Sequence, residues 1–397
     1  IAVGSSNRNQ LSFQSIKPHL KTLQLWGFYQ IKPKNSKLKR YLHRGYMAFV
    51  LSFSVLYTIQ EIIKVNQVMD DPDKVIDTMF LLLTYSEAIY KEVIFWKKED
   101  KIEELLSILK GPLFNKNEAA HRMLLLQRAR QSKMLLRTFN GAALTTCFLW
   151  VLYPGIRYAQ SKPVEFTIWL PFNPDISPIY YALVYCWIQT SLLALGNTSM
   201  DVFITFFFAQ CKTQLRILRL DLKNIVTKSE HESKTTSNSF TEAFHRHFHK
   251  IIMHYNEIVN VCQKTQDIFG GVILYLFLVN IWVICTSAYV MANVNPVSVQ
   301  FSSMCMFMVC ILTEICLYCY YGNEVTYESN FLVESVFAMD WYKVPIKQRY
   351  NIIVFMERIK RPIVLMAGAF VPLSNNTFVS ILRSSYSFYA FLKNTGE

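Results

Sequence analysis

The chain has 397 residues, of which 52% are hydrophobic and 15% aromatic, and its formal net charge is +13. Only 17% of the residues are charged, against about 25% in a typical soluble domain, so the composition argues against a soluble protein. The basic excess lies beside hydrophobic runs, which favours anionic membrane lipid over nucleic acid as its partner.

The N-terminal segment is strongly basic. Its first 44 residues contain nine Lys or Arg and no carboxylate, and the first acidic residue is Glu61. Because a basic segment next to a first membrane span stays in the cytoplasm, we expect the N-terminus to lie inside the cell. An odd number of spans would then place the C-terminus outside.

A helix that crosses a bilayer needs about 20 mostly apolar residues, and seven stretches of the chain meet or nearly meet this requirement. They are Tyr41–Val65, Val75–Trp96, Thr138–Ala159, Pro178–Ala209, Ile268–Ala292, Val297–Tyr321 and the weakest, Thr377–Leu392. The fourth is longer than a bilayer requires, so we expect it to continue below the membrane toward Leu220. The predicted fold is an all-α membrane protein with seven transmembrane helices and inverted topology.

The segments between the spans test this orientation. The predicted inner segments Lys97–Arg137, Cys211–Gln266 and Gly322–Asn376 hold ten, nine and six Lys or Arg, whereas the outer ones hold few. Apolar residues recur at helical spacing in Ile102–Leu109, Leu215–Ile225 and Tyr350–Ile359, which indicates a cytoplasmic platform of helices. Only Lys228–Ser239 has a composition typical of disorder.

We divide the chain into four parts on this basis. Residues 1–40 form a basic cytoplasmic N-terminus, and residues 41–321 hold the first six transmembrane helices with their cytoplasmic extensions. Residues 322–376 form a cytoplasmic helical anchor, and residues 377–397 form the seventh helix and an extracellular tail.

Charged residues inside the spans are candidates for function because they are unfavourable in a bilayer. Glu87 and Lys91 are four residues apart and are predicted to pair on one helix face. Asp201 and Glu314 lie deep in spans four and six, and Arg383 lies in span seven. These residues either hold helices together or mark a water-filled path or conformational lock.

A ligand pocket is predicted in the outer halves of spans two to six, which are rich in aromatic, Met, Thr and Ser residues. The candidate lining residues are Phe80, Thr84, Thr145, Leu149, Tyr153, Tyr185, Gln189, Trp282, Tyr289, Met304 and Met308. The outer loop Lys162–Pro178 is stiffened by prolines and has an apolar face that includes Phe166 and Trp169. It is either a lid over this pocket or an interfacial aromatic belt.

The sequence gives little sign of enzyme, metal or cofactor chemistry. We find no glycine-rich phosphate loop, no GxSxG and no HExxH. His245 and His249 are one helical turn apart, near His247 and His254, but no Cys or carboxylate completes a zinc site beside them. The nine cysteines fall mostly in apolar runs, which favours buried thiols over disulfides.

The C-terminal region carries an ordered series of short motifs. They are Ser329-Asn330-Phe331-Leu332, Asp340-Trp341-Tyr342, Phe355-Met356-Glu357-Arg358, Lys360-Arg361-Pro362, Ala367-Gly368, Pro372-Leu373, Thr377-Phe378 and Ser385-Tyr386-Ser387-Phe388. This series resembles the signature of insect odorant receptors, in which Trp-Tyr follows span six and a Ser-Tyr-Ser-Tyr-type motif lies in span seven. Phe388 replaces the usual last Tyr, and Met366 replaces the usual Thr before Ala-Gly.

The resemblance implies an odour-gated, non-selective cation channel in the plasma membrane of a sensory neuron dendrite. Four subunits would surround the pore, with the end of each seventh helix as lining and a gate near Ala390, Phe391 and Leu392. The obligate co-receptor has a long insertion between spans four and five, for which Cys211–Gln266 is too short. The resemblance is therefore to a ligand-specific tuning subunit that assembles with the co-receptor and binds a small volatile.

Three other classes of protein fit the sequence less well. An insect gustatory receptor has the same architecture, but its Gln-Phe ending of span seven is missing after Tyr386. A G-protein-coupled receptor has an outside N-terminus and usually a cysteine in the second outer loop, and neither feature fits. An intramembrane enzyme or transporter calls for paired catalytic residues or broken helices in matching halves, and we find neither.

Overall fold

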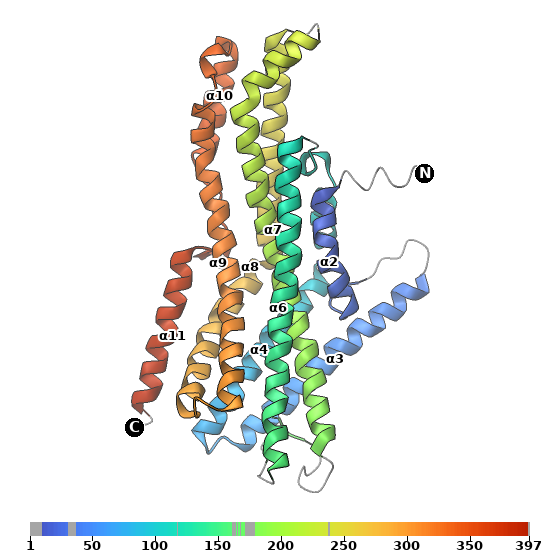
Figure 1. Ribbon diagram of the computed structural model, residues 1–397, viewed down its shortest axis with the longest axis vertical. Helices are drawn as coiled ribbons and strands as arrows, with labels where there is room; N and C mark the ends of the chain where they lie inside the picture. Colours follow the sequence, from blue (N-terminus) through green and yellow to red (C-terminus); the bar gives the residue numbers. More distant parts are fainter. Residues whose placement is uncertain are drawn as a thin grey trace.

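The computed structural model describes residues 10–30, 37–116, 118–160, 164, 166, 168–170, 179–236 and 239–395. They form an elongated bundle built almost wholly of helices (Figure 1). In chain order the elements are α2 (Leu11–Leu25), α3 (Lys37–Gln67), α4 (Pro72–Lys97), α5 (Glu99–Ile108), η1 (Pro112–Phe114), α6 (Ala119–Ala159), α7 (Ile179–Thr235), α8 (Phe240–Asn293), α9 (Val299–Phe337), η2 (Trp341–Lys343), α10 (Ile346–Ile359), β1 (Met366–Ala367), β2 (Val371–Pro372) and α11 (Asn375–Thr395).

The seven predicted spans fall on α3, α4, α6, α7, α8, α9 and α11, and α6 to α9 extend well beyond them on the inner side. Five of these, all except α4 and α11, are long and apolar enough to cross a membrane by their composition. In α4 the apolar run is interrupted by Glu87, Lys91 and Glu92, and in α11 by Arg383 and several Ser and Asn residues. Local hydropathy alone therefore does not identify α4 and α11 as membrane spans.

Several helices are far longer than a bilayer is thick. The helix α7 has 57 residues and α8 has 54, which correspond to about 80 Å at 1.5 Å per residue, against about 30 Å of hydrocarbon. The predicted continuation of span four to Leu220 is confirmed, and α7 in fact continues to Thr235. In Figure 1 these extensions form the upper half of the molecule, while α3, α4 and α11 lie in the lower half.

The prediction of disorder for residues 228–239 is wrong for residues 228–235, which are helical. Partners far away in the sequence hold this helix end. The Lys228 Nζ lies 2.7 Å from Glu118 and 2.8 Å from Asp221, and the Glu232 carboxylate lies 2.7 Å from His247. A polar composition alone does not report such pairs. Residues 237 and 238 lie outside the described part.

The centre of the bundle is α7. Every residue from Leu195 to Cys211 is buried, and this run packs against α6, α8 and α9. Gly196 makes room here for the aromatic ring of Phe28, because a Cβ at this position would lie 2.1 Å from that ring. The segment that follows α2 is thereby anchored to the core.

A short hairpin that was not predicted joins α10 to α11. Its strands β1 and β2 pair antiparallel, with Ala367 opposite Val371. Between them Gly368 has φ +60°, which favours glycine, and its N–H donates to the carbonyl of Gly270 on α8 over 2.7 Å. The Ala-Gly motif of the sequence is thus the turn that attaches the last helix to α8.

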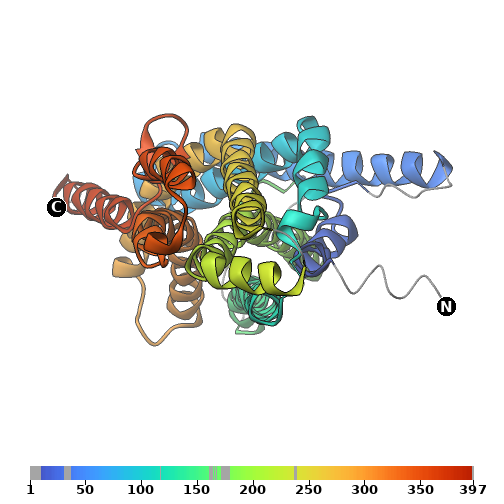
Figure 2. The same ribbon diagram turned by 90° about the horizontal axis from the view of Figure 1, so that it is seen from above.

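The last helix, α11, lies at the edge of the bundle against α8 and α9. Seen from above, α11 and the start of α3 project from opposite sides (Figure 2). The helix α11 exposes four large apolar side chains on more than one side, namely Val379, Tyr386, Phe388 and Phe391. Exposed apolar side chains gathered on one helix are typical of a surface that another molecule covers.

Candidate functional site

The bundle contains two cavities that share Leu81, Trp150 and Thr190 as wall residues. The outer cavity has a volume of about 450 Å³ and is bounded by the ends of helices, including Val68 directly after α3 and Val290 of α8. The inner cavity is smaller, about 70 Å³, and lies between α4, α6, α7 and α9. Together they form a two-chamber site in the lower half of the bundle.

The outer cavity has a basic rim. Lys64, Lys74 and Arg157 are among its lining residues, and Gln300 and Ser303 add uncharged polar groups. Its walls are otherwise largely aliphatic and aromatic. No carboxylate belongs to the described lining, so this chamber favours neutral or anionic molecules over cations.

The inner cavity is mostly apolar, and its threonine hydroxyls have their protons engaged. The hydroxyls of Thr84, Thr146 and Thr190 donate to the carbonyls of residues 80, 142 and 186 of their own helices over 2.7–3.0 Å. The hydroxyl of Thr198 donates to Asn140 Oδ1 over 2.7 Å. With these protons engaged, the threonine oxygens offer lone pairs to a ligand.

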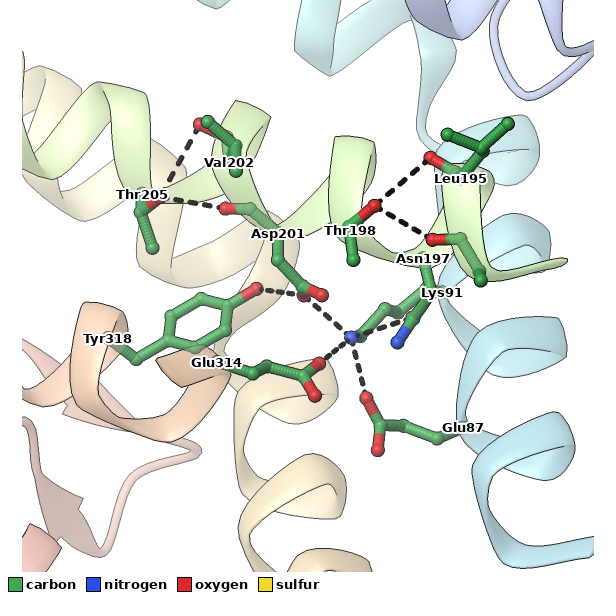
Figure 3. Close-up of polar contacts among 11 residues, drawn as sticks. Glu87, Lys91, Leu195, Asn197, Thr198, Asp201, Val202, Thr205, Glu314 and Tyr318 are labelled. Carbon is green, nitrogen blue, oxygen red and sulfur yellow. Dashed lines mark hydrogen bonds and ion pairs between the residues drawn. The ribbon is translucent and has the colours of Figure 1, made fainter. Parts of the chain in front are cut away.

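A buried ionic cluster lies at the inner end of this cavity, and Figure 3 shows its polar contacts. The Lys91 side chain is 0% exposed, and its Nζ lies 2.5 Å from Glu87, 2.6 Å from Asp201 and 2.5 Å from Glu314. The same Nζ donates to Asn197 Oδ1 over 2.9 Å. The hydroxyl of Tyr318 donates to Asp201 over 2.7 Å. Hereafter these six residues are called the Lys91 cluster.

The Lys91 cluster joins α4, α7 and α9 through one ammonium group. Such a buried group is stable only when its donors are satisfied, and here every donor has an acceptor. Glu314 and Asn197 also line the inner cavity. The predicted Glu87–Lys91 pair is confirmed, and the structure adds Asp201 and Glu314, which the sequence identified only as separate buried charges.

Four of the eleven residues predicted to line a pocket do so. Phe80, Tyr153 and Met304 line the outer cavity, and Thr84 lines the inner one. Phe80 lies at the centre of an aromatic group, 6.0 Å from the ring of Trp150 and 5.4 Å from that of Phe307. The four predicted residues that line a cavity come from three helices, α4, α6 and α9.

The other seven do not line either cavity: Thr145, Leu149, Tyr185, Gln189, Trp282, Tyr289 and Met308. Thr145 lies on the exposed face of α6. The Gln189 amide donates to the carbonyl of Phe53 over 2.9 Å, and the Tyr185 hydroxyl donates to Gln60 Oε1 over 2.8 Å. Trp282 stacks on Phe388 of α11, with ring centroids 4.8 Å apart.

Leu149 and Tyr289 are half-buried, and Met308 packs against the main apolar core. Helical rotation explains these differences, because a residue one position away on α6 or α9 points to another neighbour. The prediction missed wall residues that the structure brings together, above all Trp150, Tyr85, Phe307 and Asn197. The available signal was the seven-residue spacing of Phe307 and Glu314, which places both on one face of α9.

The loop predicted as a lid is described only in part. Val164 and Phe166 line the outer cavity, and the buried Ile168 packs with Tyr57 and Tyr85. The N–H of Trp169 donates to the carbonyl of Gln60 over 3.2 Å. Residues 161–163 and 171–178, with the loop's prolines, lie outside the described part.

The predicted gate residues lie near the end of α11. Phe391 is 65% exposed, whereas Ala390 and Leu392 are half-buried. Arg383, two turns earlier, is also exposed. The position of the gate stays a prediction.

Of the histidines considered as metal ligands, His245 and His249 are exposed on α8, and the other two have partners elsewhere. His254 bonds to Gln214 over 2.9 Å, and His247 pairs with Glu232. A different trio, Glu118, His121 and Asp221, has donor atoms close together. Lys116 and Lys228 already lie 2.5 and 2.8 Å from the Asp221 carboxylate, so two ammonium groups balance this charge instead of a metal ion.

Comparison with known proteins identifies the family. A sequence model described as 7tm Odorant receptor matches residues 71–386. The chain belongs to the 7tm odorant receptor family. Among curated relatives, odorant receptor 94a of Drosophila melanogaster is 28% identical over 250 residues, which span 61% of each chain. Odorant receptor 85c of the same species is 24% identical over 92% of this chain and 94% of that one. Odorant receptor Or1 of Anopheles gambiae is 22% identical over 89% of each.

The fold of this odorant receptor matches a solved structure. The insect olfactory receptor OR5 from Machilis hrabei, solved in complex with eugenol, gives a TM-score of 0.83 at 15% identity, over 96% of this chain and 98% of that one. The structure of the same protein described without eugenol gives 0.81. The predicted all-α fold with seven membrane helices is confirmed, with α4 and α11 as the two spans that composition leaves out.

The family assignment also decides among the classes that the sequence left open. Residues 71–386 cover α4 to most of α11, so the assignment rests on nearly the whole bundle. The matched proteins are odorant receptors, which supports the predicted absence of enzyme function. The family match also argues against a gustatory-type receptor and a G-protein-coupled receptor for this chain.

Proposed function

We propose that this odorant receptor is a subunit of a cation channel that opens when a small volatile molecule occupies the two cavities. The observation that carries this proposal is the two-chamber site, with largely apolar walls and acceptor groups inside, in a member of the odorant receptor family. It is supported by the exposed apolar side chains of α11, which suit assembly around a pore.

The proposed orientation places the upper half of Figure 1 in the cytoplasm. The described start of α2 lies in that half, and α11 ends at the lower end. The helix extensions in the upper half carry most of the Lys and Arg residues counted in the inner segments. Positive residues retained on the cytoplasmic side support an inside N-terminus and an outside C-terminus. Residues 322–376 would then belong to a cytoplasmic anchor.

The ligand we propose is a mostly apolar volatile with one hydroxyl group. Thr84, Thr146, Thr190 and the Glu314 carboxyl offer acceptors toward the inner cavity, where the Tyr85 hydroxyl is a donor without a partner among the described residues. A ligand hydroxyl, which both donates and accepts, is therefore favoured over a ketone or ether. A ligand of about ten heavy atoms that buries about 250 Å² gains roughly 6 kcal/mol before the association penalty. Affinity in the micromolar range or weaker follows.

The link from pocket to pore runs along α8 in this proposal. The helix α8 contributes Val290 to the outer cavity, and about two turns away Trp282 stacks on Phe388 of α11. A ligand that binds better when α8 is displaced would therefore move α11 as well. The apolar side chain of Phe391, repeated around a four-fold axis, would exclude water and ions when closed.

We place the protein among the tuning subunits, which assemble with the co-receptor in the plasma membrane of a sensory dendrite. The connection between α7, which ends at Thr235, and α8, which begins at Phe240, leaves no room for a long insertion. This supports a tuning subunit over the co-receptor itself.

The test is electrical recording from cells that express this chain with and without a co-receptor. Volatile alcohols and phenols, eugenol among them, should evoke cation currents only in the co-expressing cells, and the methyl ether of an active compound should be about tenfold weaker. Equal responses to alcohol and ether would refute the hydroxyl proposal alone. No current with any volatile would refute the channel proposal.

The gate is tested separately in the same cells. Phe391→Ala should raise the current recorded without odorant, because a smaller side chain leaves a wider and wetter constriction. Val379→Ala changes another exposed residue of α11 about three turns away and serves as the control. Equal leak in both variants would place the gate elsewhere.

A further inference from the structure

A third cavity, of about 350 Å³, lies between α6, α7 and α9 on the cytoplasmic side of the Lys91 cluster. We call it the Arg128 pocket. Three of its lining residues are basic, namely Arg128, Lys212 and Arg216, and no carboxylate belongs to its described lining. Tyr320 and Tyr321 of α9 form another part of the wall.

Arg128 is buried, and two of its three guanidinium nitrogen atoms lack an acceptor among the described residues. It is only 5% exposed, and its Nε and Nη1 have no hydrogen-bond partner in the described chain. None of the ion pairs among the described residues includes it. Its guanidinium lies over the rings of Phe206 and Tyr321, 5.2 and 5.5 Å from their centroids. Ring faces attract the charge, but they leave the N–H donors in the guanidinium plane unused.

An unpaired buried cation is unfavourable by several kcal/mol, so the site calls for an anionic acceptor. The neighbouring acidic residues are already engaged. Glu324 pairs with Lys212, and Glu328 pairs with both Arg216 and Arg219. The two carboxylates, Glu324 and Glu328, thus lie among four cations, namely Arg128, Lys212, Arg216 and Arg219. A formal charge of +2 remains at the pocket.

The depth of the pocket indicates where the acceptor comes from. Ala209 and Tyr321 end predicted spans four and six, Thr138 begins predicted span three, and all three line the pocket. This level is the inner membrane interface in the orientation proposed above, where tyrosines and lipid headgroups lie. Met134, which is 66% exposed, gives the rim an apolar face toward acyl chains.

From this geometry we propose that the Arg128 pocket binds the phosphate monoester of an anionic inner-leaflet lipid. A guanidinium with two free donors matches two phosphate oxygens. A phosphate monoester carries a charge of about −1.5 to −2 at neutral pH, which balances the surplus of the pocket better than a diester does. Basic pockets between membrane helices on the cytoplasmic side are known to hold such headgroups.

The experiment measures lipid binding to the full chain purified in detergent. Native mass spectrometry with equimolar short-chain phosphatidylinositol bisphosphate and phosphatidylserine should show a preference of about tenfold for the first in the wild-type protein. Arg128→Met should abolish this preference. Arg130→Met removes an exposed cation from the same helix that does not line the pocket, and it should keep the preference.

Three results would overturn the proposal. The first is no preference in the wild-type protein, which needs no variant and so does not depend on how a variant folds. The second is an equal loss in Arg128→Met and Arg130→Met, which would indicate general attraction to basic residues. The third is equal binding of soluble inositol trisphosphate, which would indicate a phosphate site that does not need lipid. None of these readouts uses odorant or current, so they are independent of the channel proposal.

Discussion

Two buried cations of this receptor are in opposite situations. Lys91 has four oxygen partners from three helices, whereas Arg128 rests between two aromatic rings with two of its nitrogen atoms unpaired. Lys91 therefore stabilises the folded chain without any ligand, and the three carboxyl groups around it need its positive charge. The two unpaired nitrogen atoms of Arg128 are available to a partner from outside the chain. The contrast separates a structural charge from a binding charge.

The largest effect should come from Lys91→Met. Three carboxyl groups would remain buried without their cation, which costs about 3–5 kcal/mol. We expect a large fall in the thermal midpoint of the detergent-solubilised protein. Combining Lys91→Met with Asp201→Asn and Glu314→Gln should recover part of the loss. An unchanged midpoint in the single variant would show that Lys91 is no more structural than Arg128.

A second prediction concerns the cavities on the outer side of the Lys91 cluster. Trp150 lines both chambers, so Trp150→Ala should weaken odorant potency about tenfold to a hundredfold in dose–response recordings, a loss of roughly 1–3 kcal/mol. Thr145→Ala, on the exposed face of the same helix, should leave potency unchanged. Lipid preference at the Arg128 pocket should be unaffected by either change. Equal potency of the two variants would move the ligand away from these cavities.

A third prediction uses His19 of α2, whose Nε2 lies 2.5 Å from Ser132 Oγ. Burial, and then the positive charge of Arg128, lower the pKa of His19 to about 3. The unfolded chain, with a pKa near 6.5, binds more protons between these values, so stability should fall as pH drops below 6.5.

The loss attributable to His19 is about 1 kcal/mol between pH 7.5 and pH 5.5. It is measured as the difference in thermal midpoint between the wild-type protein and His19→Gln across that range. The variant should show the flatter profile. Parallel profiles would mean that His19 is not held neutral beside Arg128.

The smallest effect on stability should come from Arg128→Met. Since no carboxylate partner is left behind, and two unsatisfied nitrogen atoms are removed, the thermal midpoint without added lipid should change by less than about 1 kcal/mol of stability, or rise. The same protein should lose the stabilisation by phosphatidylinositol bisphosphate that the wild type shows. A loss as large as that of Lys91→Met would contradict the distinction between the two cations.

Much of the architecture was predictable from local patterns. The apolar runs located all seven spans, and the four-residue spacing of Glu87 and Lys91 identified a pair that the structure contains. The pocket was only partly predictable, because Phe80 and Thr84 were found while Trp150 and Asn197 were not. Which side of a long helix faces the cavity depends on how it is rotated against its neighbours, and hydropathy contains no such information.

The sequence by itself determined where helices form and which segments carry positive charge, because both follow from residues close together in the chain. The C-terminal motifs likewise identified the family. Only the tertiary structure decided that Asp201 and Glu314 meet Lys91, that Gly368 attaches α11 to α8, and that two nitrogen atoms of Arg128 have no acceptor among the described residues. These facts depend on how helices distant in sequence cross one another, and such crossings are fixed by side-chain packing rather than by local periodicity.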